Sequence, residues 1–436
     1  MIKMLPTIAF IAVCWGIWAV KTLLDCKKNN IPLKLRFKDL WNNRFWIGPE
    51  SLTNVKEILA CVLIAIRFGY AVLMNYYDAP PEVQGYVYIS FLMIYTFIIG
   101  RFNLKQYIVL GAIEVLLLFD PAGYSVVFFC ILVAYDFGTE KLIKLFFTVL
   151  SVLYSAAIIL SVSGVIGTGD MSTEETRGTA DGWLSTRHSF GFCHPNTAGL
   201  MLTAWVILYF AVRYSKLKWY DWLVGAAALG VVTFVIDSRG AMVFLLAFLL
   251  LMFAARYFPK LYDFKLMKFA CPAVPVMLTG VSVFATYYYD SGNALWSKIN
   301  LLSTGRLFLM SSAAKQIPLT LYGHITNPSI SSDYYVDNFY AKFLLYQGII
   351  PLLILISCYV FLLYRLYKLK AYPEIAMVIS YLVYYCFEDR FFVASTNYSF
   401  VLFLFVFSAG SRIFISSKDS ASGNRCFSMK NGIKIN

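Results

Sequence analysis

The chain has 436 residues, of which 60% are hydrophobic and only 14% are charged, and its mean hydropathy is +0.68. So few polar side chains cannot cover the surface of a soluble protein of this length. The composition therefore excludes a soluble globular protein and predicts an integral membrane protein. The formal net charge of +13 is scattered over many loops, where Lys and Arg would face lipid headgroups, and it does not indicate nucleic-acid binding.

Apolar stretches long enough to cross the roughly 30 Å hydrocarbon core of a bilayer recur along the whole chain, some of them only with flanking residues included. We therefore expect an all-α, polytopic bundle of about 12–13 transmembrane helices. In chain order, the predicted segments are Leu5–Leu24, Ile58–Tyr76, Tyr86–Gly100, Tyr107–Phe119, Tyr124–Phe137, Leu142–Ile166, Thr197–Val212, Trp219–Ile236, Ala241–Ala255, Phe269–Tyr289, Phe343–Tyr364, Ile375–Phe387 and Tyr398–Phe414. The short fourth and fifth segments are also compatible with one re-entrant pair.

The basic residues orient this bundle. If the loop after the first segment is cytoplasmic, strict alternation places most Lys and Arg on the cytoplasmic side, as the positive-inside rule requires. Two long loops, 167–196 and 290–342, are then extracytoplasmic. We expect a single membrane domain over 1–415 and a polar, disordered cytoplasmic tail over 416–436. The cysteines are dispersed and form no CxxC pair, so neither a disulfide framework nor a thiolate metal site is expected.

Polar motifs gather at the outer ends of the predicted segments. The sequence "RHSFGFCHPN" closes the first long loop and contains Arg187, His194 and Asn196. One interpretation is an ordinary helix start, with Asn196 as the cap or Pro195 in the first turn. The sequence "DSRGA" places Arg239 at the outer end of an apolar hairpin. Cations at membrane depth are costly and usually have a partner or a task, which favours a functional role.

The second long loop adds further polar groups. The sequence "STGR" contains Arg306, "YGH" contains His324, and "VDNFY" brings Asp337 and Asn338 directly before the eleventh segment. Other ionisable residues in or beside apolar segments are weaker candidates, and the last three of them are also compatible with local pairing: Arg67, Glu114, Glu388, Asp389 and Arg390.

These motifs, in this order and on one membrane face, resemble those of the bacterial O-antigen polymerase and ligase superfamily, and most of all the Wzy-type polymerases of capsular and exopolysaccharide. The resemblance covers about 187–348, where Gly348 follows the asparagine of "VDNFY" by ten residues. It implies a GT-C-like helical fold in the bacterial cytoplasmic membrane. It also implies a glycosyltransferase that moves a glycan from undecaprenyl diphosphate onto a second lipid-linked repeat unit at the outer face.

The residue chemistry suits such a reaction. Breaking a glycosyl-diphosphate bond releases an anion, and planar guanidinium groups bind phosphate oxygens in pairs. We therefore expect Arg187, Arg239 and Arg306 to bind the diphosphate. An acceptor hydroxyl needs a base near neutral pH, for which His324 is the first candidate and Asp337 the second.

Other polar and aromatic residues of the outer loops are expected to bind the glycan or to position the loops. They are His194, Asn196, Asn338, Trp183 and Tyr335. No DxD pair or histidine spacing typical of a metal site occurs in these loops, so we expect no metal and no other cofactor. The expected partners are the lipid-linked oligosaccharide, the bilayer, a chain-length regulator and a flippase.

Two other functions remain compatible with the sequence. A ligase would use the same donor but pass the glycan to a different acceptor. A polysaccharide transporter or flippase would not be an enzyme, although transporters tend to show two matching halves and polar groups near the bilayer midplane, which this chain lacks.

Overall fold

The computed structural model describes residues 139–165, 174–178, 184–192, 194–303, 305–324, 336–390 and 397–403, together with Phe414 and a few single positions before residue 63. The chain divides into two compact units. One comprises Met1–Leu153, Phe392–Ser395 and Lys418–Asn436, and the other comprises Tyr154–Phe391 and Thr396–Ser417. Nearly all described elements belong to the second unit, so a single domain over 1–415 stays a prediction.

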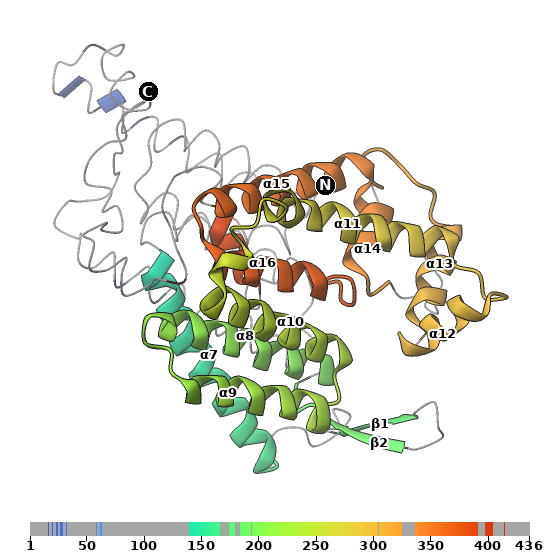
Figure 1. The fold of residues 1–436 in the computed structure, drawn as a ribbon, viewed down its shortest axis with the longest axis horizontal. Helices are drawn as coiled ribbons and strands as arrows, with labels where there is room; N and C mark the ends of the chain where they lie inside the picture. The colour runs from blue at the N-terminus through green and yellow to red at the C-terminus, as the bar shows by residue number, and fades with distance from the viewer. Residues whose placement is uncertain are drawn as a thin grey trace. The chain divides into compact units, whose positions relative to one another are not determined.

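The described residues are mostly helical (Figure 1). The α-helices are α7 (Thr139–Val162), α8 (Pro195–Arg213), α9 (Trp219–Gly230), α10 (Arg239–Tyr257), α11 (Met267–Tyr288), α12 (Ala294–Leu302), α13 (Arg306–Gln316), α14 (Phe339–Gln347), α15 (Ile349–Lys368) and α16 (Tyr372–Tyr384). Shorter helical turns are η4 (Tyr214–Lys216), the π-helical η5 (Val231–Val235), η6 (Pro259–Leu261) and η7 (Tyr398–Phe403).

Five helices of the described part are long and apolar enough to cross a membrane, namely Thr139–Val162, Pro195–Lys216, Arg239–Tyr257, Met267–Tyr288 and Ile349–Lys368. Each falls on a predicted segment, and together they support the expectation of a helical membrane protein. The five predicted segments that precede α7 and the tail 416–436 lie outside the described residues. The total number of helices therefore stays a prediction.

Two features of the fold were not expected from the sequence. The first long loop contains an antiparallel strand pair, β1 (Glu174–Gly178) and β2 (Leu184–His188), so the fold is not purely α. The second is a break in the predicted eleventh segment, which forms α14 and α15 on either side of Gly348. Gly348 has a φ of +90°, and a Cβ atom there would lie 2.5 Å from the backbone nitrogen of Gly323. The glycine lets the two backbones meet, and it interrupts the helix.

The core of the second unit lies where α10 packs on α16 and α8 packs on α10. The Phe244 ring of α10 contacts Tyr381 and Tyr384 of α16, with ring centroids 4.8 Å away in both cases. On α8, a Cβ atom at Gly199 would lie only 2.9 Å from the Cβ of Ala241. Such small residues let membrane helices approach closely, and here they bring the start of α8 against the start of α10.

Candidate active site

Arg187 lies on β2, whose pairing with β1 places it opposite Glu175. It is only 5% exposed. Its Nε donates to the carbonyl of Asp237 at 3.2 Å, and its Nη2 donates to Oδ1 of Asn196 at 2.9 Å. Asp237 has a φ of +50°, a conformation that few residues other than glycine adopt, and it directs this carbonyl toward the arginine. Arg187 therefore joins the first outer loop to the junction before α10.

The "HPN" sequence begins α8, with His194 as its cap. The Nδ1 atom of His194 accepts the backbone N–H of Asn196 at 3.0 Å, and Pro195 occupies the first turn. The expectation that Asn196 would be the cap was therefore wrong. The Asn196 side chain faces away from the helix end instead. It accepts from Arg187 and from Ser238 Oγ (3.1 Å), and its Nδ2 donates to Glu388 Oε1 at 2.8 Å.

Glu388 follows α16 and connects the two halves of the cluster. The same Oε1 that accepts from Asn196 also accepts from Arg306 Nη2 at 3.1 Å. The residue is 5% exposed and packs against Gly240, where a Cβ atom would lie 3.6 Å from Oε1. Burial raises the pKa of Glu388, and the positive charge of Arg306 opposes the rise. Glu388 is thus paired across the fold, with Asn196 and Arg306.

Arg306 is the first residue of α13, and each of its guanidinium nitrogens has a partner. Its Nε lies 2.9 Å from Asp337 Oδ2, its Nη2 reaches Glu388, and its Nη1 donates to the carbonyl of Phe387. Burial raises the pKa of Asp337, Arg306 acts against that rise, and the nearby negative charge of Asp389 adds to it. One guanidinium therefore holds two carboxylates that burial makes unusually basic.

We call this set the arginine–carboxylate network: Arg187, Asn196, Glu388, Arg306 and Asp337. Its members come from four separate stretches of sequence, yet each is hydrogen-bonded or ion-paired to the next. Four of the five were predicted as site residues. The fifth, Glu388, was only a weaker candidate, and the one signal for it in the sequence is an acidic group directly after an apolar helix.

Asn338 follows Asp337 and anchors this part of the network to the fold. It caps α14 by accepting the backbone N–H of Ala341 at 3.0 Å. Its Nδ2 donates to Ser282 Oγ of α11 at 3.0 Å and to the carbonyl of Cys386 at 2.9 Å. With its whole amide engaged inside the fold, Asn338 positions Asp337 beside it. Nearby, Lys342 of α14 forms an ion pair with Asp389.

Two other predicted residues, Arg239 and His324, bond elsewhere in the described part of the chain. Arg239 is exposed at the start of α10, and its Nη1 donates to the carbonyl of Leu302 at 3.1 Å. His324 is partly exposed; its Nε2 lies 3.1 Å from the carbonyl of Pro318, and its backbone N–H donates to Tyr346. Since a carbonyl can only accept, Nε2 carries the proton in that contact. Trp183 and Tyr335 lie outside the described residues, as do Arg67 and Glu114.

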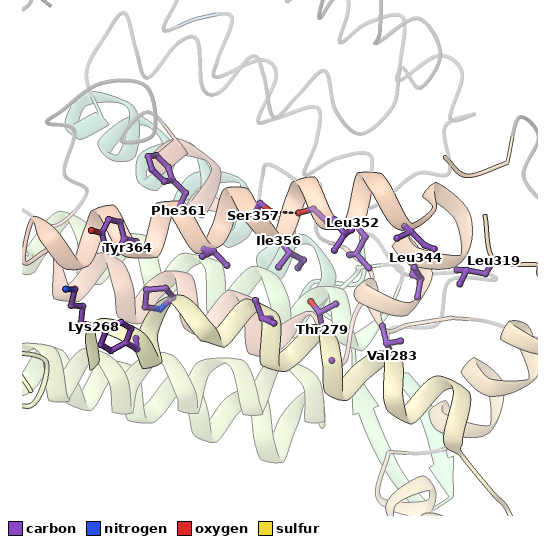
Figure 2. A pocket seen from close by; sticks show the side chains of 17 residues that line it. Lys268, Thr279, Val283, Leu319, Leu344, Leu352, Ile356, Ser357, Phe361 and Tyr364 are labelled. Atoms are coloured by element: carbon purple, nitrogen blue, oxygen red, sulfur yellow. Dashed lines mark hydrogen bonds between the residues drawn. The ribbon is translucent and has the colours of Figure 1, made fainter. Parts of the chain in front are cut away.

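An apolar groove of about 900 Å³ runs between α11 and α15 (Figure 2). Figure 2 shows Lys268 and Tyr364 at one end of the groove and Val283, Leu319 and Leu344 at the other. At the second end, Val283 directly follows Ser282, the hydrogen-bond partner of Asn338, and Asn338 is the neighbour of Asp337 in the network. The lining is otherwise almost entirely aliphatic and aromatic, and Lys268 is its one charged residue.

No protein-family model matches the chain, and no curated protein and no solved structure matches it either. The structure itself supports a helical membrane protein, with five described helices long and apolar enough to cross a membrane and a partly buried arginine–carboxylate network at helix ends. Among the described residues, no three His, Cys, Asp or Glu side chains converge as metal ligands would. Independence from metal and from other cofactors stays a prediction.

Proposed function

We propose that this chain is a repeat-unit polymerase of the bacterial cytoplasmic membrane. It transfers a glycan from undecaprenyl diphosphate onto a second lipid-linked repeat unit at the outer face, in the synthesis of capsule, exopolysaccharide or O-antigen. The observation that carries the proposal is the arginine–carboxylate network. Motifs that resemble those of O-antigen polymerases, and that lie far apart in sequence, supply residues to one hydrogen-bonded cluster.

In this proposal, Arg306 and Arg239 bind the diphosphate. Both are accessible from solvent, whereas Arg187 is 5% exposed and serves to orient Asn196. Arg239 directly precedes Gly240, against which Glu388 packs, so the start of α10 that carries Arg239 lies beside the carboxylate that Arg306 binds. Guanidinium groups bind two phosphate oxygens at once, and they stabilise the charge that grows on the leaving diphosphate.

We assign the base to Asp337 in place of His324. The hydrogen bonds of His324 go to its own loop and to the end of α14, whereas Asp337 contacts Arg306 directly. Burial raises the pKa of Asp337 toward neutrality, which makes its carboxylate a better proton acceptor. In the transfer step the acceptor oxygen bonds to the anomeric carbon, its proton passes to Asp337, and the carbon–oxygen bond to the diphosphate breaks.

The groove between α11 and α15 suits the tail of such a lipid donor. It is apolar, it follows two helices that are long enough to cross a membrane, and Val283 at one of its ends directly follows Ser282, which binds Asn338. We propose that the lipid tail lies in the groove and that its diphosphate reaches the network past that end. The lipid bilayer and the lipid-linked glycan are thus the partners that we propose for this region.

Purified protein mixed with a defined undecaprenyl-diphosphate repeat unit tests the function. We expect a ladder of lipid-linked products that differ by whole repeats, and no ladder from Asp337→Asn. A single transfer to an added foreign acceptor, with no ladder, would indicate a ligase. Movement of intact substrate across a vesicle membrane, with no new glycosidic bond, would indicate a transporter and refute the proposal.

A further inference from the structure

Each nitrogen of the Arg306 guanidinium already has a protein partner, and these contacts use three of its five N–H groups. Asp337, Glu388 and the Phe387 carbonyl each take one of its nitrogens. A diphosphate that binds Arg306 in pairs, through Nε and Nη2, must therefore displace Asp337, which holds Nε. The two carboxylates differ in how easily they can leave, because the side chain of Asp337 is 20% exposed and that of Glu388 is 7% exposed.

Glu388 is also the better anchored of the two. Its Oε1 accepts from Asn196 as well as from Arg306, and its chain packs against Gly240. The Asp337 carboxylate has Arg306 as its ion-pair partner at 2.9 Å. Lys342, the next cation along α14, is paired with Asp389. An anion that arrives from solvent thus displaces Asp337 from Arg306 more easily than Glu388, which stays bound to the arginine.

We propose that Arg306 masks the catalytic base of this protein until the donor diphosphate displaces Asp337 from it. The inference rests on the proposed function. Once Asp337 has lost its cation, the buried carboxylate prefers to hold a proton, so it accepts the proton of the acceptor hydroxyl more readily. Donor binding thereby activates the base, and an acceptor bound alone meets a carboxylate that is still neutralised by the arginine.

Competition between the diphosphate and Asp337 gives donor binding a pH dependence of known sign. The charged groups that act on Asp337 are Arg306, Glu388, Asp389, Lys342 and Arg390. The pKa of Asp337 is raised by burial, so protonation begins above the usual range of an aspartate. A protonated Asp337 releases Arg306. Diphosphate affinity should therefore increase as pH falls, whereas transfer should slow because the base is neutralised.

Titration of the purified full chain with geranyl diphosphate tests this inference. At about pH 7.5, we expect Asp337→Asn to bind the probe roughly tenfold more tightly than the wild type, the factor that corresponds to one pKa unit. At a lower pH the wild-type affinity should approach that of the variant, because Asp337 takes up a proton above the usual range of an aspartate. The phosphate of the probe titrates identically with both proteins, so the difference between them isolates Asp337.

Asp389→Asn is the matched control. It removes the same charge from the same region, but its partner is Lys342 and not Arg306, so it should tighten binding much less. Equal tightening by both variants, or weaker binding by Asp337→Asn, would overturn the inference. The wild-type pH series needs no variant, and an affinity that does not change with pH would overturn it as well.

The two proposals fail in different ways. Tight, pH-dependent binding of the probe without any polymer ladder would refute the polymerase function alone. A ladder from a wild-type protein whose probe affinity is the same at both pH values, and the same in Asp337→Asn, would refute the masking of the base alone.

Discussion

Removal of the Glu388 carboxylate should destabilise the protein more than its single charge suggests. In Glu388→Ala, Arg306 Nη2 and Asn196 Nδ2 lose their shared acceptor inside the fold. Loss of one partner from a buried ion pair costs about 3–5 kcal/mol. The Arg306 side chain is 25% exposed, so water replaces part of the lost contact, and we expect about 2–4 kcal/mol. Glu388→Gln keeps one acceptor oxygen and should cost about 1–2 kcal/mol.

Unfolding in mixed detergent micelles, followed by circular dichroism at neutral pH, measures this free energy. The matched control is Glu140→Gln on α7. Glu140 forms an exposed ion pair with Lys144 at 2.7 Å, and such surface pairs contribute well under about 1 kcal/mol. A double-mutant cycle of Glu388→Ala with Asn196→Ala should give a coupling energy of about 0.5–3 kcal/mol, because the two side chains are directly bonded.

The result that would refute this reasoning is a Glu388→Ala variant no less stable than Glu140→Gln, together with additive effects of the Glu388 and Asn196 substitutions. Glu388 would then not bond to these partners in the folded protein. The structural basis of the arginine–carboxylate network would fail with it.

Three further predictions concern the same region. His324→Gln should still make polymer, because an amide N–H can replace the imidazole N–H in the loop. Asp337→Asn should lower the transfer rate by about 10²–10⁴. The reverse outcome in the ladder assay would show that His324 is the base. Gly348→Ala should cost at least about 1–3 kcal/mol of unfolding free energy, because its φ is +90° and the new methyl group would collide with Gly323; an unchanged melting temperature would contradict the close backbone contact. Finally, the raised pKa values of Asp337 and Glu388 mean that the folded state binds protons more tightly than the unfolded state. Their contribution to stability is therefore present at low pH and is lost as pH rises from about 4 through the raised values. The double variant Asp337→Asn, Glu388→Gln should flatten that part of the plot of unfolding free energy against pH.

Hydropathy predicted the membrane-length helices of the described residues, because each is a long apolar run, but it did not predict α12 and α13 in the second long loop. The strand pair escaped prediction since "EETRG" and "LSTRH" are short and polar and have no apolar alternation. The break at Gly348 escaped it for another reason: apolar residues continue on both sides, and only the contact with Gly323 makes a helix impossible there.

The site was predicted in part. Arg187, Asn196, Arg306 and Asp337 were identified from motifs, and the structure joins them. Their partner Glu388 lies 192 residues from Asn196, and nothing local distinguishes a long-range partner from pairing within "EDR". Whether a polar residue faces a ligand or its own fold also depends on tertiary contacts. Asn338 illustrates this, since the bonds of its amide group stay inside the protein.

The geometry of the site depends on a close contact between α8 and α10, one helical turn further along α8. Gly199 lies three residues after Asn196 on the same face of α8, and Ala241 lies three residues after Ser238. Because a Cβ atom at Gly199 would already overlap Ala241 and Ser238, the gap between α8 and α10 is at its minimum there. One added methyl group at Gly199 would push α8 and α10 apart at that point. The spacing between Asn196 and Ser238 therefore depends on the missing side chain of Gly199, one helical turn away.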